Sequence, residues 1–118
     1  MHVAIVGSRD LPDCFYETLC AHVPIGASEI RSGGANGTDT LAARYAQENG
    51  LRLTVIEPNY AQYGRRAPLE RSERIIGGAD YVLALWNGCS RGTAYVIKAC
   101  LERNIPVRVL LCHKKDIT

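Results

Sequence analysis

The sequence lacks the cysteine and histidine patterns of disulfide-bonded and metal-binding proteins. The cysteine count is odd and no Cys-x-x-Cys pair occurs, so the sequence predicts reduced thiols and a cytoplasmic location rather than a secreted disulfide framework. None of the three histidines pairs with a cysteine at zinc-ligand spacing, and we expect no metal site and no cofactor. The five cysteines are Cys14, Cys20, Cys89, Cys100 and Cys112.

Long hydrophobic runs and a strong excess of one charge are also missing. The opening MHVAIVGSRD is too short in apolar residues for a signal sequence or a membrane span, so no membrane association is expected. The formal net charge of +2 is too small to indicate nucleic-acid binding by itself. With 118 residues and no repeat or linker, residues 1–118 are predicted to form a single domain.

Strand-like and helix-like segments alternate along the chain. The strands read as unbroken apolar runs, which is typical of a parallel sheet covered on both faces. We therefore expect an α/β fold, a Rossmann-like three-layer sandwich with a mainly parallel five-stranded sheet and the first strand placed centrally. The predicted strands are 2–7, 28–32, 51–57, 81–86 and 106–112, and the predicted helices are 14–23, 39–48, 68–78 and 94–104.

Three local features complete this prediction. Asp13 is expected to cap the first helix with its side chain. Residues 58–67 read as a loop longer than is usual between a strand and a helix, which favours a functional loop or lid. Residues 113–118, HKKDIT, read as a polar solvated tail.

Three loops rich in small residues follow predicted strands, at 7–9, 33–39 and 87–93. In open parallel sheets, ligands bind beyond the carboxyl ends of the strands, where the strand order reverses. Glycines and the unpaired amides of a helix start can hold an anion, so these loops predict a phosphate or nucleotide pocket, with a tight turn as the alternative for each loop alone. The predicted binding residues are Gly7, Ser8, Arg9, Gly33, Gly34, Ala35, Gly37, Thr38, Asp39, Arg71, Trp86, Ser90, Gly92 and Thr93.

Two common nucleotide motifs are absent. No Gly-Lys-Ser/Thr follows either later loop, which argues against ATP hydrolysis of the P-loop type. The first loop does not read Gly-x-Gly-x-x-Gly, which argues against a standard dinucleotide dehydrogenase.

Several side chains allow two interpretations. Asp39 either favours the dipole of its helix or accepts hydrogen bonds from ribose hydroxyls. Arg9 and Arg71 are candidate anion contacts, whereas the neighbouring arginines read as a solvated helix face. Trp86 either stacks on a base or covers the core.

The chain resembles members of the SLOG superfamily, most closely the YspA-like branch of small stand-alone domains. The matching stretches are VAIVGSRDLPD, SGGANGTDTLAARYA, YGRRAPLERSERI and ALWNGCSRGTAYVI, in the expected order over nearly the whole chain. The resemblance implies a Rossmann-like fold that binds a nucleotide, a nucleotide-derived ligand or nucleic acid, and Arg71 matches the arginine on the family's helix. Because relatives often pair through their helices, a homodimer is expected.

Two more distant relatives suggest alternative functions. The LOG-type phosphoribohydrolases cleave the N-glycosidic bond of a nucleotide with a glutamate in a Gly-Gly-x-Gly-Thr-x-x-Glu motif, but Val96 stands in the glutamate's place in CSRGTAYV. DprA/Smf proteins share the SGGANGTDTLA type of loop and bind single-stranded DNA, but this chain shows no clear basic track. Sensing of a nucleotide-derived ligand is therefore the main hypothesis, followed by an N-glycosidase and then a DNA-binding module.

Overall fold

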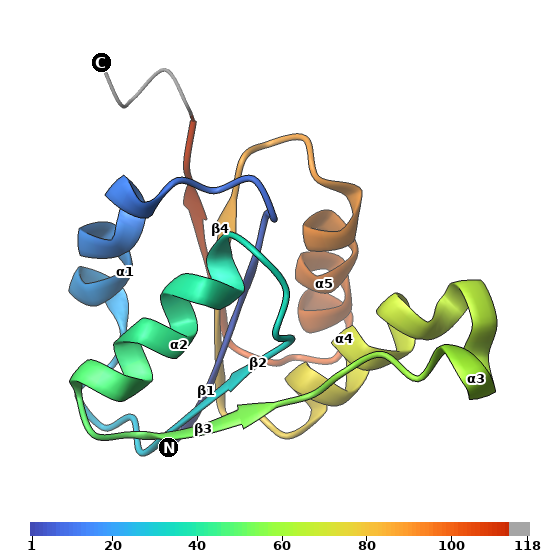
Figure 1. Cartoon of the computed structure of the whole chain (residues 1–118), viewed down its shortest axis with the longest axis horizontal. Helices are drawn as coiled ribbons and strands as arrows, with labels where there is room; N and C mark the ends of the chain where they lie inside the picture. The colour runs from blue at the N-terminus through green and yellow to red at the C-terminus, as the bar shows by residue number, and fades with distance from the viewer. Residues whose placement is uncertain (114–118) are drawn as a thin grey trace.

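Five strands form one sheet in which all neighbouring pairs are parallel, in the order β3-β2-β1-β4-β5 (Figure 1). The computed structural model of the chain describes residues 1–113. This arrangement confirms the predicted Rossmann-like α/β fold and the central position of the first strand. The strands are β1 (His2–Gly7), β2 (Glu29–Ser32), β3 (Arg52–Val55), β4 (Tyr81–Trp86) and β5 (Val107–Leu111).

Helices cover both faces of the sheet because its central strands are apolar on both sides. Successive residues of β1 point to opposite faces, so Val3 and Ile5 join one core cluster while Ala4 joins the other. The helices α1 (Tyr16–His22) and α2 (Thr38–Glu48) pack on the first face, and α4 (Ala67–Gly77) and α5 (Arg91–Glu102) pack on the second (Figure 1). The result is the predicted three-layer sandwich.

Three local predictions need correction. Asp13 does not cap α1 with its side chain; it begins a short 3-10 turn, Asp13–Phe15, that leads into the helix. Residues 58–67 are not an open loop, because they contain the short helix α3 (Tyr60–Tyr63) and a 3-10 turn, Gly64–Arg66. The strand predicted at 51–57 shortens to β3 at the edge of the sheet, and the predicted tail falls outside the described residues from 114 onward.

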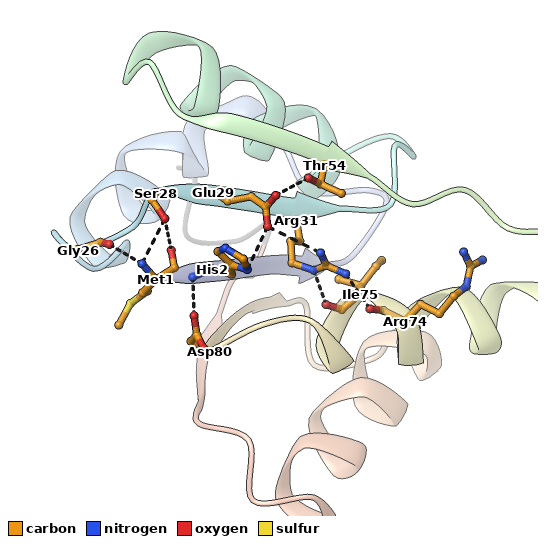
Figure 2. Close-up of polar contacts among 10 residues, drawn as sticks. All are labelled: Met1, His2, Gly26, Ser28, Glu29, Arg31, Thr54, Arg74, Ile75 and Asp80. Carbon is orange, nitrogen blue, oxygen red and sulfur yellow. Dashed lines mark hydrogen bonds and ion pairs between the residues drawn. The ribbon is translucent and has the colours of Figure 1, made fainter.

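The amino edge of the sheet carries a network of polar contacts (Figure 2). The carboxylate of Glu29 accepts a hydrogen bond from the Thr54 hydroxyl at 2.7 Å and lies 3.3 Å from Nδ1 of His2. Arg31 extends from β2 to the end of α4, where its guanidinium donates to the carbonyls of Arg74 and Ile75 at 3.0 Å each. These contacts join β1, β2, β3 and α4 at the edge opposite to the predicted site.

Candidate functional site

A cleft of about 420 Å³ opens at the carboxyl edge of the sheet. It lies at the point where the strand order reverses, because β1 has β2 on one side and β4 on the other. The loops after β1 and β2, the body of α4 and the start of α5 together form its walls. The lining residues are Val6, Gly7, Arg9, Asp10, Gly33, Asp39, Pro68, Leu69, Arg71, Ser72, Ile75, Ser90, Gly92, Thr93 and Val96.

The cleft combines charged groups with an apolar wall. Arg9 and Arg71 supply two guanidinium groups, and Asp39 supplies a carboxylate. The wall formed by α4 and α5 includes Ile75 and Val96, both at most 3% exposed. A ligand that suits these groups has an anionic part, hydroxyl or amine donors, and a flat or apolar part.

Arg71 is the charged side chain that the fold places most firmly. It extends from α4 to the loop after β2, where its Nη1 donates to the carbonyl of Gly33 at 3.0 Å. Its Nε is buried, and among residues 1–113 no atom accepts a hydrogen bond from it. The Nε has almost no accessible surface, so an anion in the cleft would contact the part of the Arg71 side chain that lines it.

The loop after β2 is held tightly against the loop after β1. The amide and the hydroxyl of Thr38 both donate to the carbonyl of Ser8, at 3.2 and 3.0 Å, and Thr38 is fully buried. Gly37 has φ +68°, and a Cβ on it would overlap the backbone of Ser8 and Arg9. Thr38 was predicted to bind the ligand; instead its hydroxyl and amide join the two loops.

Asp39 lies at the start of α2, where its carboxylate favours the helix dipole, the first of its two predicted roles. It lies in the first turn of the helix, and its Oδ2 accepts a hydrogen bond from the amide of Ala35 at 3.0 Å. It also lines the cleft, so the prediction that it accepts from ribose hydroxyls stays open as a second role.

The loop before α5 is closed on itself by its own side chains. Oδ1 of Asn87 accepts hydrogen bonds from the amides of Cys89 and Ser90, both at 2.8 Å. The hydroxyl of Ser90 caps α5 by accepting from the amide of Thr93 at 3.4 Å. The start of this helix therefore uses several of its amides internally.

These bonds correct the predicted anion cradle. Four of the main-chain amides expected to face a phosphate already have acceptors within the chain, namely those of Ala35, Thr38, Ser90 and Thr93. The amides order the loops, and the guanidinium groups at the cleft become the main candidates for holding an anion.

Ser8 and Trp86, like Thr38, support the site without lining the main cleft. Ser8 is 1% exposed, and its hydroxyl accepts a hydrogen bond from the amide of Asn87 at 3.1 Å. The indole N–H of Trp86 donates to the carbonyl of Ser90 at 2.9 Å, which orders the loop before α5. Trp86 does not line the main cleft, and the prediction that its ring stacks on a base stays a prediction.

A second cleft of about 390 Å³ adjoins the first and shares Arg9, Gly33 and Arg71 with it. The predicted residues Gly34 and Ala35 lie here rather than in the main cleft. Its other lining residues are Asn36, Glu57 and Pro58.

Sequence reasoning predicted Arg71 but missed the other residues of α4 that line the main cleft. Pro68, Ser72 and Ile75 lie three or four residues apart on one face of the helix, and Leu69 and Arg71 line the cleft beside them. This spacing was visible in the sequence, but only the position of the loops shows which face of α4 they meet.

Comparisons with family models, curated proteins and solved structures give no match for this chain. The resemblance to the SLOG superfamily stays a prediction. Within residues 1–113, no three side chains of the metal-ligating types gather into a group. In the same part of the chain, no helix combines the length and the hydropathy that crossing a bilayer requires.

Proposed function

We propose that this protein binds a nucleotide or a nucleotide-derived ligand in the cleft at the carboxyl edge of its sheet. The observation that carries the proposal is the pair of guanidinium groups, those of Arg9 and Arg71, that line this cleft where the strand order reverses. The bond from Arg71 to the carbonyl of Gly33 holds one of them in place. A phosphate can accept from both guanidinium groups.

The remaining walls fit the other parts of a nucleotide. The exposed side chain of Leu69 suits one face of a base, and the carboxylate of Asp39 suits ribose hydroxyls. The volume of about 420 Å³ lies within the usual range for small-ligand sites.

The structure favours binding over hydrolysis as the main activity. Val96 lines the cleft at the position where the LOG-type hydrolases that this chain resembles have a glutamate. A valine has no proton to give or accept, so an N-glycosidase reaction would have to depend on the remaining carboxylates, Asp10 and Asp39. We keep this reaction as the second hypothesis.

Titration calorimetry with AMP, ADP and adenosine tests the proposal. We expect AMP and ADP to bind more tightly than adenosine, because the guanidinium groups act on the phosphate. Arg44→Ala is the control for substitutions of the cleft arginines and should leave all three affinities unchanged. Arg44 lies on α2 and pairs with Glu48 away from the cleft. Equal affinities for all three compounds, or no binding at all, would contradict the proposal.

Two further assays address the alternatives. Chromatography of the same mixtures detects released base, and intact nucleotide after long incubation would remove the hydrolase hypothesis. Single-stranded DNA is tested at several salt concentrations, because binding through phosphates weakens steeply as salt rises.

The cellular location and the oligomeric state of the protein are also proposals. We place the protein in the reducing cytoplasm, because its five cysteines are free thiols. The expected homodimer is checked by light scattering with and without ligand.

A further inference from the structure

We propose that the outer edge of β5 pairs with the same edge of a second copy of this chain, so that two sheets join across a two-fold axis. β5 is the last strand in the sheet order, and among residues 1–113 it pairs only with β4. Its side chains Val109 and Leu111 are 41% and 55% exposed. An exposed apolar edge strand is a surface that another strand can extend. No residue of β5 lines either cleft, so this inference does not depend on the ligand.

The hydrogen bonds between β4 and β5 show which backbone groups of β5 face outward. The amide of Cys112 donates to the carbonyl of Trp86 on β4 at 2.7 Å. Along a strand, alternate residues direct their backbone groups to the same neighbour, so every second residue back from Cys112 also faces β4. The residues between them direct their N–H and C=O groups away from the sheet, where a further strand can pair with them. These outward residues are Val107, Val109 and Leu111.

A two-fold axis at Val109 gives an antiparallel pair of strands in which every outward residue has a partner. Val109 then lies opposite its own copy, and Val107 lies opposite Leu111 of the second copy. Both are pairs of outward residues, so each exchanges its two N–H···O bonds. The side chains on this face form a continuous apolar ladder across the axis.

The charge on β5 favours a second copy as the occupant and fixes the register. Arg108 is the only charged residue of the strand VRVLL. An axis at Arg108 would place two guanidinium groups directly opposite each other, which destabilises a strand pair. With the axis at Val109, Arg108 instead lies opposite Leu110 of the second copy, which its long apolar stem can cover. The strand is therefore complementary to itself in this register.

An exposed leucine of α5 lies on the same side of the sheet as this apolar ladder. Val107 packs in the core cluster that α5 covers, so the outward side chains of β5 are on the α5 face. Tyr95 of α5 donates to Glu73 of α4, which shows the flank that faces α4. Leu101 lies about 240° further around the helix, on the flank away from α4, and is 66% exposed. Because α5 contacts β5, the axis brings these flanks of the two copies toward each other.

Light scattering on sized fractions over a range of concentrations tests the proposal. We expect the wild type at high concentration to have about twice the monomer mass of 12.9 kDa. Val109→Lys would place two ammonium groups opposite each other, so the variant should keep the monomer mass at the same concentration. Leu53→Lys is the matched control, because Leu53 is 37% exposed on the other edge strand, β3, and should leave the dimer intact.

A cross-link tests the register independently. At an antiparallel hydrogen-bonded pair the two Cα atoms are about 5.5 Å apart, a distance that a disulfide spans. Val109→Cys should therefore give a covalent dimer with oxidised glutathione, whereas Arg108→Cys should not, because it faces a leucine. Both variants are made with the exposed cysteines replaced by serine, namely Cys14, Cys20 and Cys89.

The outcomes keep this inference separate from the proposed function. A monomeric wild type at every concentration overturns it, and so does a dimer that survives Val109→Lys, because the two chains would then pair through another surface such as their helices. Cross-linking of Arg108→Cys instead of Val109→Cys overturns the register. Circular dichroism checks that each variant is folded, and calorimetry should show unchanged nucleotide affinity in Val109→Lys. Failure of every nucleotide to bind would overturn the proposed function and leave the dimer untouched.

Discussion

Two arginines join β2 to α4, and they do so at opposite edges of the same sheet. Arg31 lies on β2 and donates to two carbonyls at the end of α4, with its Nη1 3.7 Å from the carboxylate of Glu29 (Figure 2). Arg71 lies on α4 and donates to the carbonyl of Gly33 after β2, while its Nε is buried with no acceptor in residues 1–113. Both residues are arginines, but the guanidinium of Arg31 has two carbonyl acceptors and a carboxylate nearby, whereas that of Arg71 has one carbonyl acceptor among residues 1–113.

This difference separates a structural contact from a binding site. At the amino edge, the guanidinium neutralises the negative end of the α4 dipole and a buried carboxylate, so the group is used by the fold. At the carboxyl edge, one bond to the carbonyl of Gly33 positions the guanidinium, and the side chain lines a cleft. The comparison predicts that one arginine contributes to stability and the other to ligand affinity.

The largest effect is expected for Arg31→Met. It removes two charge-assisted hydrogen bonds and should lower the free energy of unfolding by about 2–4 kcal/mol. Nucleotide affinity should stay within about twofold of the wild type, because the clefts are at the other edge. Urea unfolding and titration calorimetry measure the two quantities. A large loss of affinity in a variant that is still folded would break the comparison.

The reciprocal substitution, Arg71→Met, should show the opposite pattern. It removes one bond to Gly33 and should lower the free energy of unfolding by about 1 kcal/mol. It should weaken nucleotide binding by about 1.5–3 kcal/mol, roughly 10- to 150-fold, because the charge that contacts phosphate is lost. Arg71→Lys keeps the charge without the fork of donors and should recover only part of the affinity. Unchanged affinity in both variants would assign Arg71 to the fold alone.

Glu29→Gln sharpens the comparison at the amino edge through pH. The hydrogen bond from Thr54 is the main cause that lowers the pKa of Glu29, opposed by burial and assisted by His2 and Arg31. Because the folded pKa is lowered, the carboxylate stabilises the fold above about pH 4.3, and this contribution is lost as the pH falls through the folded pKa. At neutral pH the variant should be less stable by about 1 kcal/mol.

Urea unfolding from pH 7 down to pH 3 tests this prediction. The stabilities of wild type and Glu29→Gln should converge in acid, because the variant has no carboxylate to protonate. A constant difference across the range would mean that Glu29 acts through packing alone.

The sheet could be predicted from the sequence because its signals are local. The apolar runs of β1 and β4 and the stops at Gly7 and Asn49-Gly50 mark strands and helices without knowledge of their neighbours. The edge strand β3 was predicted too long, because an apolar run cannot show where pairing with a single neighbour ends.

The candidate site was predicted less completely, for a physical reason. The glycine loops indicate the edge of the sheet at which the main cleft opens, but an amide bonds whichever acceptor lies nearest. The acceptors are Ser8, Asp39, Asn87 and Ser90, and for the last three the side chain that accepts lies within four residues of the amide. Such local bonds compete with a ligand, and a glycine pattern does not distinguish the two.

The smallest effect is expected for Asp39→Asn, which tests the two roles of this residue at the carboxyl edge. An asparagine can still accept from the amide of Ala35 but lacks the charge that favours the helix start, so the free energy of unfolding should fall by about 0.3–1 kcal/mol. If Asp39 also binds ribose, the substitution should weaken the binding of AMP more than that of dideoxy-AMP, which lacks both ribose hydroxyls. Calorimetry on both nucleotides with both proteins gives this difference directly. An equal loss of affinity for the two nucleotides would leave Asp39 with its role in α2 alone. The acceptor for the ribose hydroxyls would then be Asp10, the other carboxylate that lines the cleft.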